Sequence, residues 1–388
     1  MKYIKIFNIF VIILFLQLPI KILQFNIGDY VIVYKDVITF LLLFLSLLKF
    51  KQKILHFNKK RLYLFILILI SLVSVLFIYL LKMNDIFNIF WHFRNDFLLP
   101  IVIVLYLSTL ETNKLSDIFI QFIFIIKVFM IINIILTMMQ IYFGNEFYSI
   151  FHIPLGDKFI KNASVLNLIR PIGIFRSPDM LGFFAYFSFF IFLLIKENVI
   201  WKILSLFLLL FSTSKTSILM LLTLIIIIPV IKFKTIRLFM FFLPIVFIFY
   251  FQFLNDMLLH FFSLLIDDKD LNVYLIASLL DRINNIWDSS YNNFFYNNDI
   301  INMLFGASLS DNSITKDNLF YFVLLNYGTI FFTIFFITML YLSIKNKYNA
   351  LLIIPIFYAG IFLDIIENLI FQVFFFLVLV IINRRSCK

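Results

Sequence analysis

The chain has 388 residues, of which 63% are hydrophobic and 14% are charged, and its formal net charge is +11. Soluble domains carry roughly 25% charged residues, so this composition excludes a soluble globular protein. The single cysteine, Cys387, excludes a disulfide framework, and the four histidines lack the spacing of metal ligands. The sequence therefore predicts a membrane protein that needs no metal or cofactor, and no basic motif indicates nucleic acid as a partner.

Apolar runs close to the roughly 20 residues that cross a bilayer recur along the chain. They occupy residues 4–20, 30–48, 62–81, 97–110, 117–141, 179–196, 199–213, 216–232, 236–253, 319–344, 349–363 and 366–382. The pairs meeting at Ser212–Lys215 and Asp364–Glu367 could each form one broken helix, but splitting them gives about twelve helices. The predicted fold is all-α and polytopic, with helices in 1–253, one large polar loop in 254–318 and further helices in 319–388.

Basic residues predict the orientation of these helices. With twelve helices, the Lys and Arg clusters at 49–61, 232–237, 345–347 and 384–388 all fall on the side of the N-terminus. Cytoplasmic loops carry an excess of Lys and Arg. Both termini are therefore predicted to be cytoplasmic, and the loops 144–178 and 254–318 to face outward.

The outward side nevertheless carries basic residues near the ends of predicted helices. Each can be interpreted as an interfacial side chain that reaches headgroups, but as a group they favour an anion site. They are Arg94, Arg170, Arg176, Lys215 and Arg282. Lys127 differs because it lies in the middle of the run 117–141, where an ammonium needs either a partner, such as Asp36, or a water-filled substrate path.

Three outward stretches have the composition of a binding site. In the first, Arg170 and Arg176 precede a helix that begins near Pro178, and Gly173 permits a tight turn between them. A helix N-terminus attracts anions, so two guanidiniums beside it would clamp a diphosphate; an ordinary loop-to-helix junction is the alternative. The second stretch, Ser212–Ser217, carries hydroxyls that can satisfy a broken helix, although this does not require Lys215.

The third stretch is the large loop. Apolar residues from 271 to 288 are spaced close to the helical period, which predicts an amphipathic helix on the outer membrane surface. Arg282 lies within it. Gly306, the pair Asp317-Asn318 and Gly328 follow.

These motifs, in this order, resemble the O-antigen polymerase and O-antigen ligase superfamily over residues 165–345. The family pattern Arg-x-x-Gly-x-Phe, then a polar-Pro pair, an acid or amide and a small-residue helix, fits Arg170, Gly173, Phe175, Pro178, Asp179 and Gly182. Ser214-Lys215 matches a family Ser-Arg pair with Lys in place of Arg. In the loop, Arg282, Trp287 and Gly306 match, although Ser308 replaces a second glycine. Ligases of the family look like His-Asn where this chain has Asp317-Asn318, which favours a polymerase.

The resemblance implies an enzyme of the bacterial inner membrane that joins oligosaccharide units linked to undecaprenyl diphosphate, with membrane lipid, a chain-length regulator and a flippase as partners. It implies diphosphate binding by Arg170, Arg176 and Arg282, assisted by Lys215, with Gly173 and Asn318 also in the binding site. Asp317 is the first candidate for the catalytic base and Asp179 the second, with helix capping as the alternative for both. A ligase with another acceptor and a flippase remain alternatives. The flippase is less favoured, because the sequence shows neither the repeated halves nor the acidic residues deep in the helix bundle that transporters often have.

Overall fold

The computed structural model is predominantly helical and divides into two units. It describes residues 11–12, 24–27, 30–33, 39–47, 98–108, 112–144, 164–165, 168–169, 171–175, 177–250, 288–295, 299–306, 318–361 and 368–385. The first unit comprises residues 1–57, 98–222 and 368–388, and the second comprises residues 58–97 and 223–367. The predicted helix 62–81 and most of the predicted helix 4–20 lie outside the described residues.

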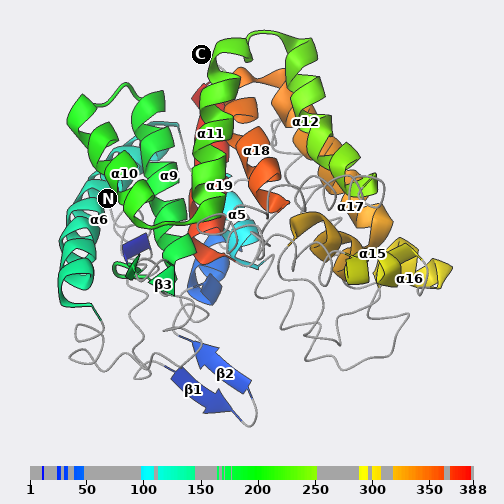
Figure 1. The fold of residues 1–388 in the computed structure, drawn as a ribbon, viewed down its shortest axis with the longest axis horizontal. Coiled ribbons are helices and arrows are strands. Elements are labelled where there is room, and N and C mark those ends of the chain that lie inside the picture. The colour runs from blue at the N-terminus through cyan, green and yellow to red at the C-terminus, as the bar shows by residue number, and fades with distance from the viewer. Residues whose placement is uncertain are drawn as a thin grey trace, which may run out of the picture. The chain divides into compact units, whose positions relative to one another are not determined.

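The helices of the first unit pack around α19. They are α5 (Leu99–Ser108), α6 (Thr112–Phe143), α9 (Pro178–Leu194), α10 (Val199–Phe211), the first half of α11 (Lys215–Val230) and α19 (Leu369–Arg385). α19 contacts α5, α6 and α9, and α10 contacts α6 and α9 (Figure 1). Phe374 of α19 is central to this core: its ring centroid lies 5.3 Å from that of Phe122, 5.8 Å from Phe184 and 5.5 Å from Phe187. Contacts between aromatic rings at these distances stabilise the core beyond the burial of their apolar surface.

Most helix positions in this unit agree with the apolar runs of the sequence. The run around Ser212–Lys215 is two helices, as the split predicted, because α10 ends at Phe211 and α11 begins at Lys215. Thr213 between them has a positive φ of 49°, which lies in the left-handed region and interrupts a right-handed α-helix. The chain therefore turns sharply at this point.

Two short antiparallel hairpins accompany the helices. β1 (Gln24–Ile27) pairs with β2 (Tyr30–Val33), and β3 (Ser164–Val165) pairs with β4 (Leu168–Ile169). The apolar run 30–48 thus begins with a strand and is helical at 39–47.

The second unit contains α12 (Lys234–Phe249), α15 (Asp288–Phe295), α16 (Ile300–Phe305), α17 (Leu319–Lys345) and α18 (Lys347–Gly360). α17 contacts each of the other four helices (Figure 1). α15 and α16 belong to the segment predicted as one large polar loop, so that segment is partly helical. The predicted surface helix 271–288 lies outside the described residues except for Asp288.

α17 is kinked at Gly328, where the C-terminal end of α16 packs against it. Gly328 has φ 76° and ψ 175°, which interrupts the helix, and all residues from Leu319 to Gly328 are buried. Gly306, at the end of α16, also has a positive φ of 94°. A Cβ on Gly328 would collide with the backbone of Leu304 and Gly306, and one on Gly306 would collide with the backbone of Asn326. Two backbones can approach this closely only without side chains between them.

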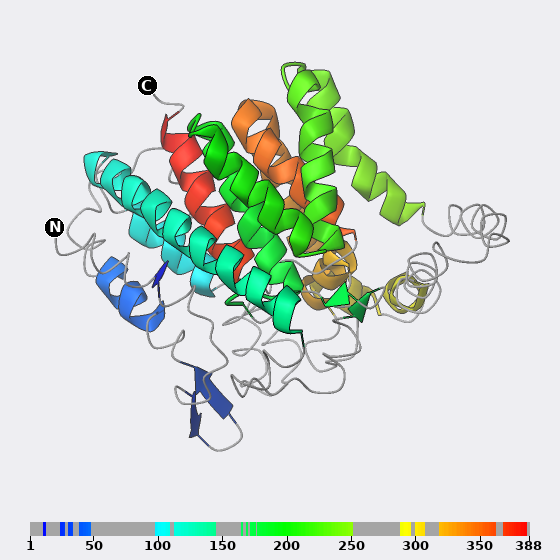
Figure 2. The same cartoon turned by 60° about the vertical axis from the view of Figure 1, so that its left-hand side comes forward.

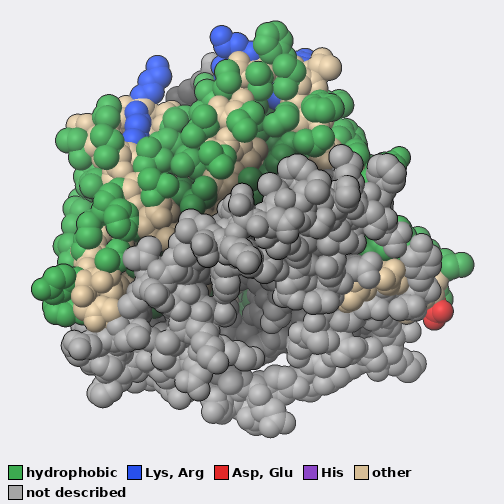
Figure 3. Space-filling view, viewed as in Figure 1, with side chains coloured by type: hydrophobic (Ala, Val, Ile, Leu, Met, Phe, Trp, Pro, Cys, Tyr) green, Lys and Arg blue, Asp and Glu red, His purple; other side chains and the backbone are tan. Residues whose placement is uncertain are grey.

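Large apolar side chains are exposed along several helices. Residues Leu115–Phe143 of α6 and Leu319–Lys345 of α17 are each long and apolar enough to cross a membrane. On α6, for example, Ile120 is 63% and Phe124 is 67% exposed. Figure 3 shows hydrophobic side chains over most of the visible described surface, with Lys and Arg at the ends of helices. An apolar surface of this extent suits contact with lipid, which is consistent with a helical membrane protein.

Candidate functional site

The turn that lies between Arg170 and Arg176 in the sequence is held by one glutamine of α6. The Gln140 side-chain oxygen accepts hydrogen bonds from the N–H groups of Ile172 and Gly173, both at 2.9 Å. Its side-chain nitrogen donates to the Gly173 carbonyl at 3.0 Å. Gln140 is 1% exposed and the turn is buried. Because unpaired backbone groups are costly away from water, these three bonds fix the path of the turn.

Asn133, about two helical turns earlier on α6, holds the next residue of the turn. Its side-chain oxygen accepts from the N–H of Ile174 at 2.9 Å, and its nitrogen donates to the Phe129 carbonyl at 2.8 Å. Gly173 has φ 58°, and a Cβ there would collide with the Asn133 side chain. The glycine predicted for a tight turn is therefore also required by the close approach of α6.

The N-terminus of α9 follows this turn directly. Ser177 caps α9 by accepting a hydrogen bond from the N–H of Met180 at 3.2 Å, and Pro178 lies in the first turn. Asp179, also in the first turn, places a carboxylate where the helix dipole stabilises negative charge. These features explain why α9 begins here.

The turn between α10 and α11 meets Asp179 through the hydroxyl of Ser214. Ser214 Oγ donates to Asp179 Oδ1 at 2.8 Å and lies 3.0 Å from Thr216 Oγ1 and 3.1 Å from Ser217 Oγ. Ser214, Thr216 and Ser217 are buried, whereas Lys215 is exposed. Four polar side chains thus form one cluster with a lysine beside it.

Gly182 allows this cluster to form. A Cβ on Gly182 would collide with the side chains of Ser214 and Ser217. α9 and the start of α11 therefore pack at a distance that only glycine permits. This gives a physical reason for the small residue that follows Asp179 in the sequence motif.

Of the eight predicted site residues, the structure brings Gly173, Asp179 and Lys215 together at one end of the first unit. Asn318 belongs to the second unit, where it caps α17: its side-chain oxygen accepts from the N–H groups of Phe320 and Tyr321, and its nitrogen donates to the Ile361 carbonyl. Asn318 is 1% exposed, so its described contacts are structural. Arg170, Arg176, Arg282 and Asp317 lie outside the described residues.

Sequence reasoning missed Asn133, Gln140 and Ser214 as contributors to this site. Asn133 and Gln140 are amides inside an otherwise apolar run, and such groups need partners when buried. Two isolated amides in an apolar run indicate that they need hydrogen-bond partners, but the sequence does not show which groups those partners are. Ser214 was noted as a hydroxyl of a broken helix and as part of the Ser214-Lys215 pair, but its bond to Asp179, which joins positions 35 residues apart, was not predicted.

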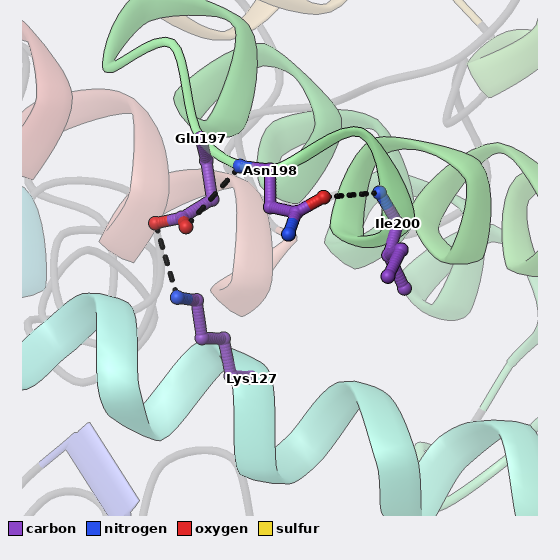
Figure 4. Close-up of polar contacts among 4 residues, drawn as sticks. All are labelled: Lys127, Glu197, Asn198 and Ile200. Atoms are coloured by element: carbon purple, nitrogen blue, oxygen red, sulfur yellow. Dashed lines mark hydrogen bonds and ion pairs between the residues drawn. The ribbon is translucent and has the colours of Figure 1, made fainter.

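Lys127 forms an ion pair rather than standing alone in the middle of its helix. Its Nζ lies 3.0 Å from Glu197 Oε2, at the turn between α9 and α10 (Figure 4). The same Nζ lies 5.2 Å from the centre of the Trp201 ring. Glu197 also accepts a hydrogen bond from the N–H of Asn198. The suggested partner Asp36 lies outside the described residues. These contacts support a structural ion pair for Lys127 rather than a role in a substrate path.

Replacing Glu197 with Gln is expected to lower thermal stability at neutral pH but not in acid. The hydrogen bond from Lys127 lowers the pKa of Glu197 below its ordinary 4.5. The carboxylate therefore contributes stability above the unfolded-state pKa, and this contribution is lost as pH falls through the lower folded-state pKa. Thermal unfolding of detergent-purified protein should show a difference of at most about 1 kcal/mol at pH 7, shrinking below pH 4.5. An undiminished difference in acid would contradict this role.

Comparisons with profiles of known protein families, with characterised proteins and with solved structures found no match to this chain. The resemblance to the O-antigen polymerase and ligase superfamily therefore rests on the motifs themselves. The geometry above adds that two of these motifs, around Asp179 and around Ser214, are in direct contact.

Proposed function

We propose that this protein is an oligosaccharide repeat-unit polymerase of the bacterial inner membrane, with both termini in the cytoplasm and its site on the outer face. The observation that carries the proposal is the contact between the α9 N-terminus and the Ser214-Lys215 turn, beside the turn that lies between Arg170 and Arg176 in the sequence. Cations and a helix N-terminus at one place suit a diphosphate.

The proposed reaction needs no activated nucleotide, because its donor carries a lipid diphosphate. The acceptor hydroxyl oxygen attacks the anomeric carbon of the donor sugar. The bond from that carbon to the diphosphate oxygen breaks, and the lipid diphosphate leaves. A carboxylate takes the hydroxyl proton, and cations neutralise the charge that develops on the leaving group.

Positively charged residues are assigned to the diphosphate, and carboxylates are assigned to the transfer of the hydroxyl proton. We assign the diphosphate to Arg170, Arg176 and Arg282, assisted by Lys215. Asp317 is the proposed base and Asp179 the second candidate. For Asp179, the hydrogen bond from Ser214 orients the carboxylate but also supports a purely structural bridge between α9 and α11.

Deleting the gene is expected to remove long polysaccharide chains while a single repeat unit is still transferred to its final acceptor. A polymerase acts before transfer, so its loss leaves the other steps intact. Gel electrophoresis of cell-surface polysaccharide should show the ladder of longer bands vanish and the one-unit band remain. Complementation with the intact gene should restore the ladder.

Loss of the one-unit band as well would contradict polymerisation. Undecaprenyl-linked chains accumulating on the outer face would then indicate a ligase. Single lipid-linked units accumulating on the cytoplasmic face would indicate a flippase. The location of the lipid-linked material therefore separates the three functions.

A further inference from the structure

The second unit carries an exposed basic surface where the start of α12 meets the turn between α17 and α18. We call it the basic end; its exposed residues are Lys232, Lys234, Lys345 and Lys347. The sequence contains no Asp or Glu from residue 198 to 255 or from 318 to 363. No carboxylate from α12, α17 or α18 can therefore neutralise these lysines.

Arg237 joins the start of α12 to the end of α17 within the basic end. It lies in the first turn of α12, is 6% exposed, and donates from Nη1 to the carbonyls of Ser343 and Ile344 at 3.0 Å each. These carbonyls belong to the last turn of α17, where orphan acceptors favour a cation. The contact places Lys234 on the same end of the unit as Lys345 and Lys347.

Aromatic side chains flank the lysines in the manner of a membrane interface. Lys345 Nζ donates to the Tyr341 hydroxyl at 3.0 Å, and Lys347 Nζ lies 5.1 Å from the centre of the Tyr348 ring. Phe233, between Lys232 and Lys234, is 61% exposed. Tyrosines and lysines of this kind belong at headgroup depth, where the ring contacts acyl chains and the ammonium contacts phosphate.

We propose that the basic end binds the headgroups of anionic phospholipids through its four exposed lysines. The partner is identified by charge complementarity, because four exposed lysines lie beside exposed aromatic residues and helices α12, α17 and α18 carry no carboxylate. The residues of this surface are not those assigned to the proposed polymerase site, and the proposal does not depend on the reaction. Each lysine near an anionic surface is expected to strengthen binding about fivefold.

The test compares lipid binding by the purified full-length protein and its variants. Native mass spectrometry should show retention of phosphatidylglycerol in preference to phosphatidylcholine with the same acyl chains. The pairs K232Q/K234Q and K345Q/K347Q should each weaken phosphatidylglycerol binding by roughly tenfold or more, and the four lysine-to-arginine changes together should preserve it. A comparison variant is K196Q/K202Q at the α9–α10 turn, where Glu197 lowers the net positive charge, and it should weaken binding less than either of these pairs.

Two results would overturn the proposal. The first is wild-type affinity for phosphatidylglycerol in both glutamine pairs. The second is equal protection against thermal unfolding by inorganic phosphate and by phosphatidylglycerol, because that would make the basic end a site for free anions. Protection by the lipid alone supports the assignment.

Discussion

Gln140→Ala is expected to abolish polymer formation while the protein still accumulates in the membrane. The substitution leaves the N–H groups of Ile172 and Gly173 and the carbonyl of Gly173 without their partner. Each such group costs about 1–3 kcal/mol when buried, so the turn should leave its native path rather than keep all three unpaired. Arg170 and Arg176 flank this turn in the sequence, so a displaced turn is expected to impair the diphosphate binding proposed for them.

The measurement is the polysaccharide ladder beside the membrane protein level. The polysaccharide ladder should be lost, as is also expected for an Arg170→Ala strain. The amount of protein in the membrane should stay close to that of the wild type. Gln140→Glu keeps the acceptor oxygen and should retain part of the activity. Thr137→Val provides a control on the same helix, because the buried Thr137 hydroxyl has no hydrogen-bond partner among the residues that the structure describes, and it should leave the ladder intact.

A normal ladder from Gln140→Ala would exclude Gln140 as the residue that positions the turn. Equal loss of polymer and protein would instead indicate a general role in folding. Asn133→Ala offers an independent check, since it removes one hydrogen bond to the turn, the one from Ile174, whereas Gln140→Ala removes three. It should be milder than Gln140→Ala.

Gly328→Ala is expected to destabilise the second unit by several kcal/mol. An alanine would have to adopt φ 76° and ψ 175°, which costs on the order of 1–3 kcal/mol. Its Cβ would also collide with the backbone of Leu304 and Gly306, which cannot move aside as a side chain can. Because whole domains are stable by only about 5–15 kcal/mol, thermal unfolding in detergent should shift markedly downward and less protein should accumulate.

The matched comparison is Gly360→Ala. Its added Cβ meets only the side chain of Leu319, and Gly360 has a helical backbone, so the loss should be smaller. Gly306→Ala should resemble Gly328→Ala, and the double variant should lose less than the sum because both glycines serve one contact. Additive losses would show that the two glycines act separately.

The sequence predicted helices better than it predicted their breaks. α9, α10, α17 and α19 lie close to apolar runs because a run of this length has few alternatives to a helix. The kink at Gly328 was not predicted. A glycine in an apolar run is compatible with a straight helix, and only the docking of Gly306 makes a positive φ favourable here.

Prediction of the site was limited by tertiary contacts. Gly173 and Asp179 could be chosen from local chemistry, since a turn glycine and a first-turn carboxylate act within a few residues. Gln140 could not be chosen in this way, because its partners lie 32 and 33 residues away. The same limit applies to Lys127, whose partner Glu197 is fixed only when α9 and α10 pack against α6.

The length of α6 has a consequence for the bilayer in which the protein works. Its 32 residues measure about 48 Å along the axis, whereas a hydrocarbon core is about 30 Å thick, and α6 lies at an angle to α9 and α19 (Figure 2). A helix that is longer than the core accommodates by tilting, and its tilt changes with bilayer thickness. Because α6 carries Asn133 and Gln140, which hold the turn 171–175, such tilting would be transmitted to that turn. Acyl-chain length is therefore expected to affect the proposed polymerase activity.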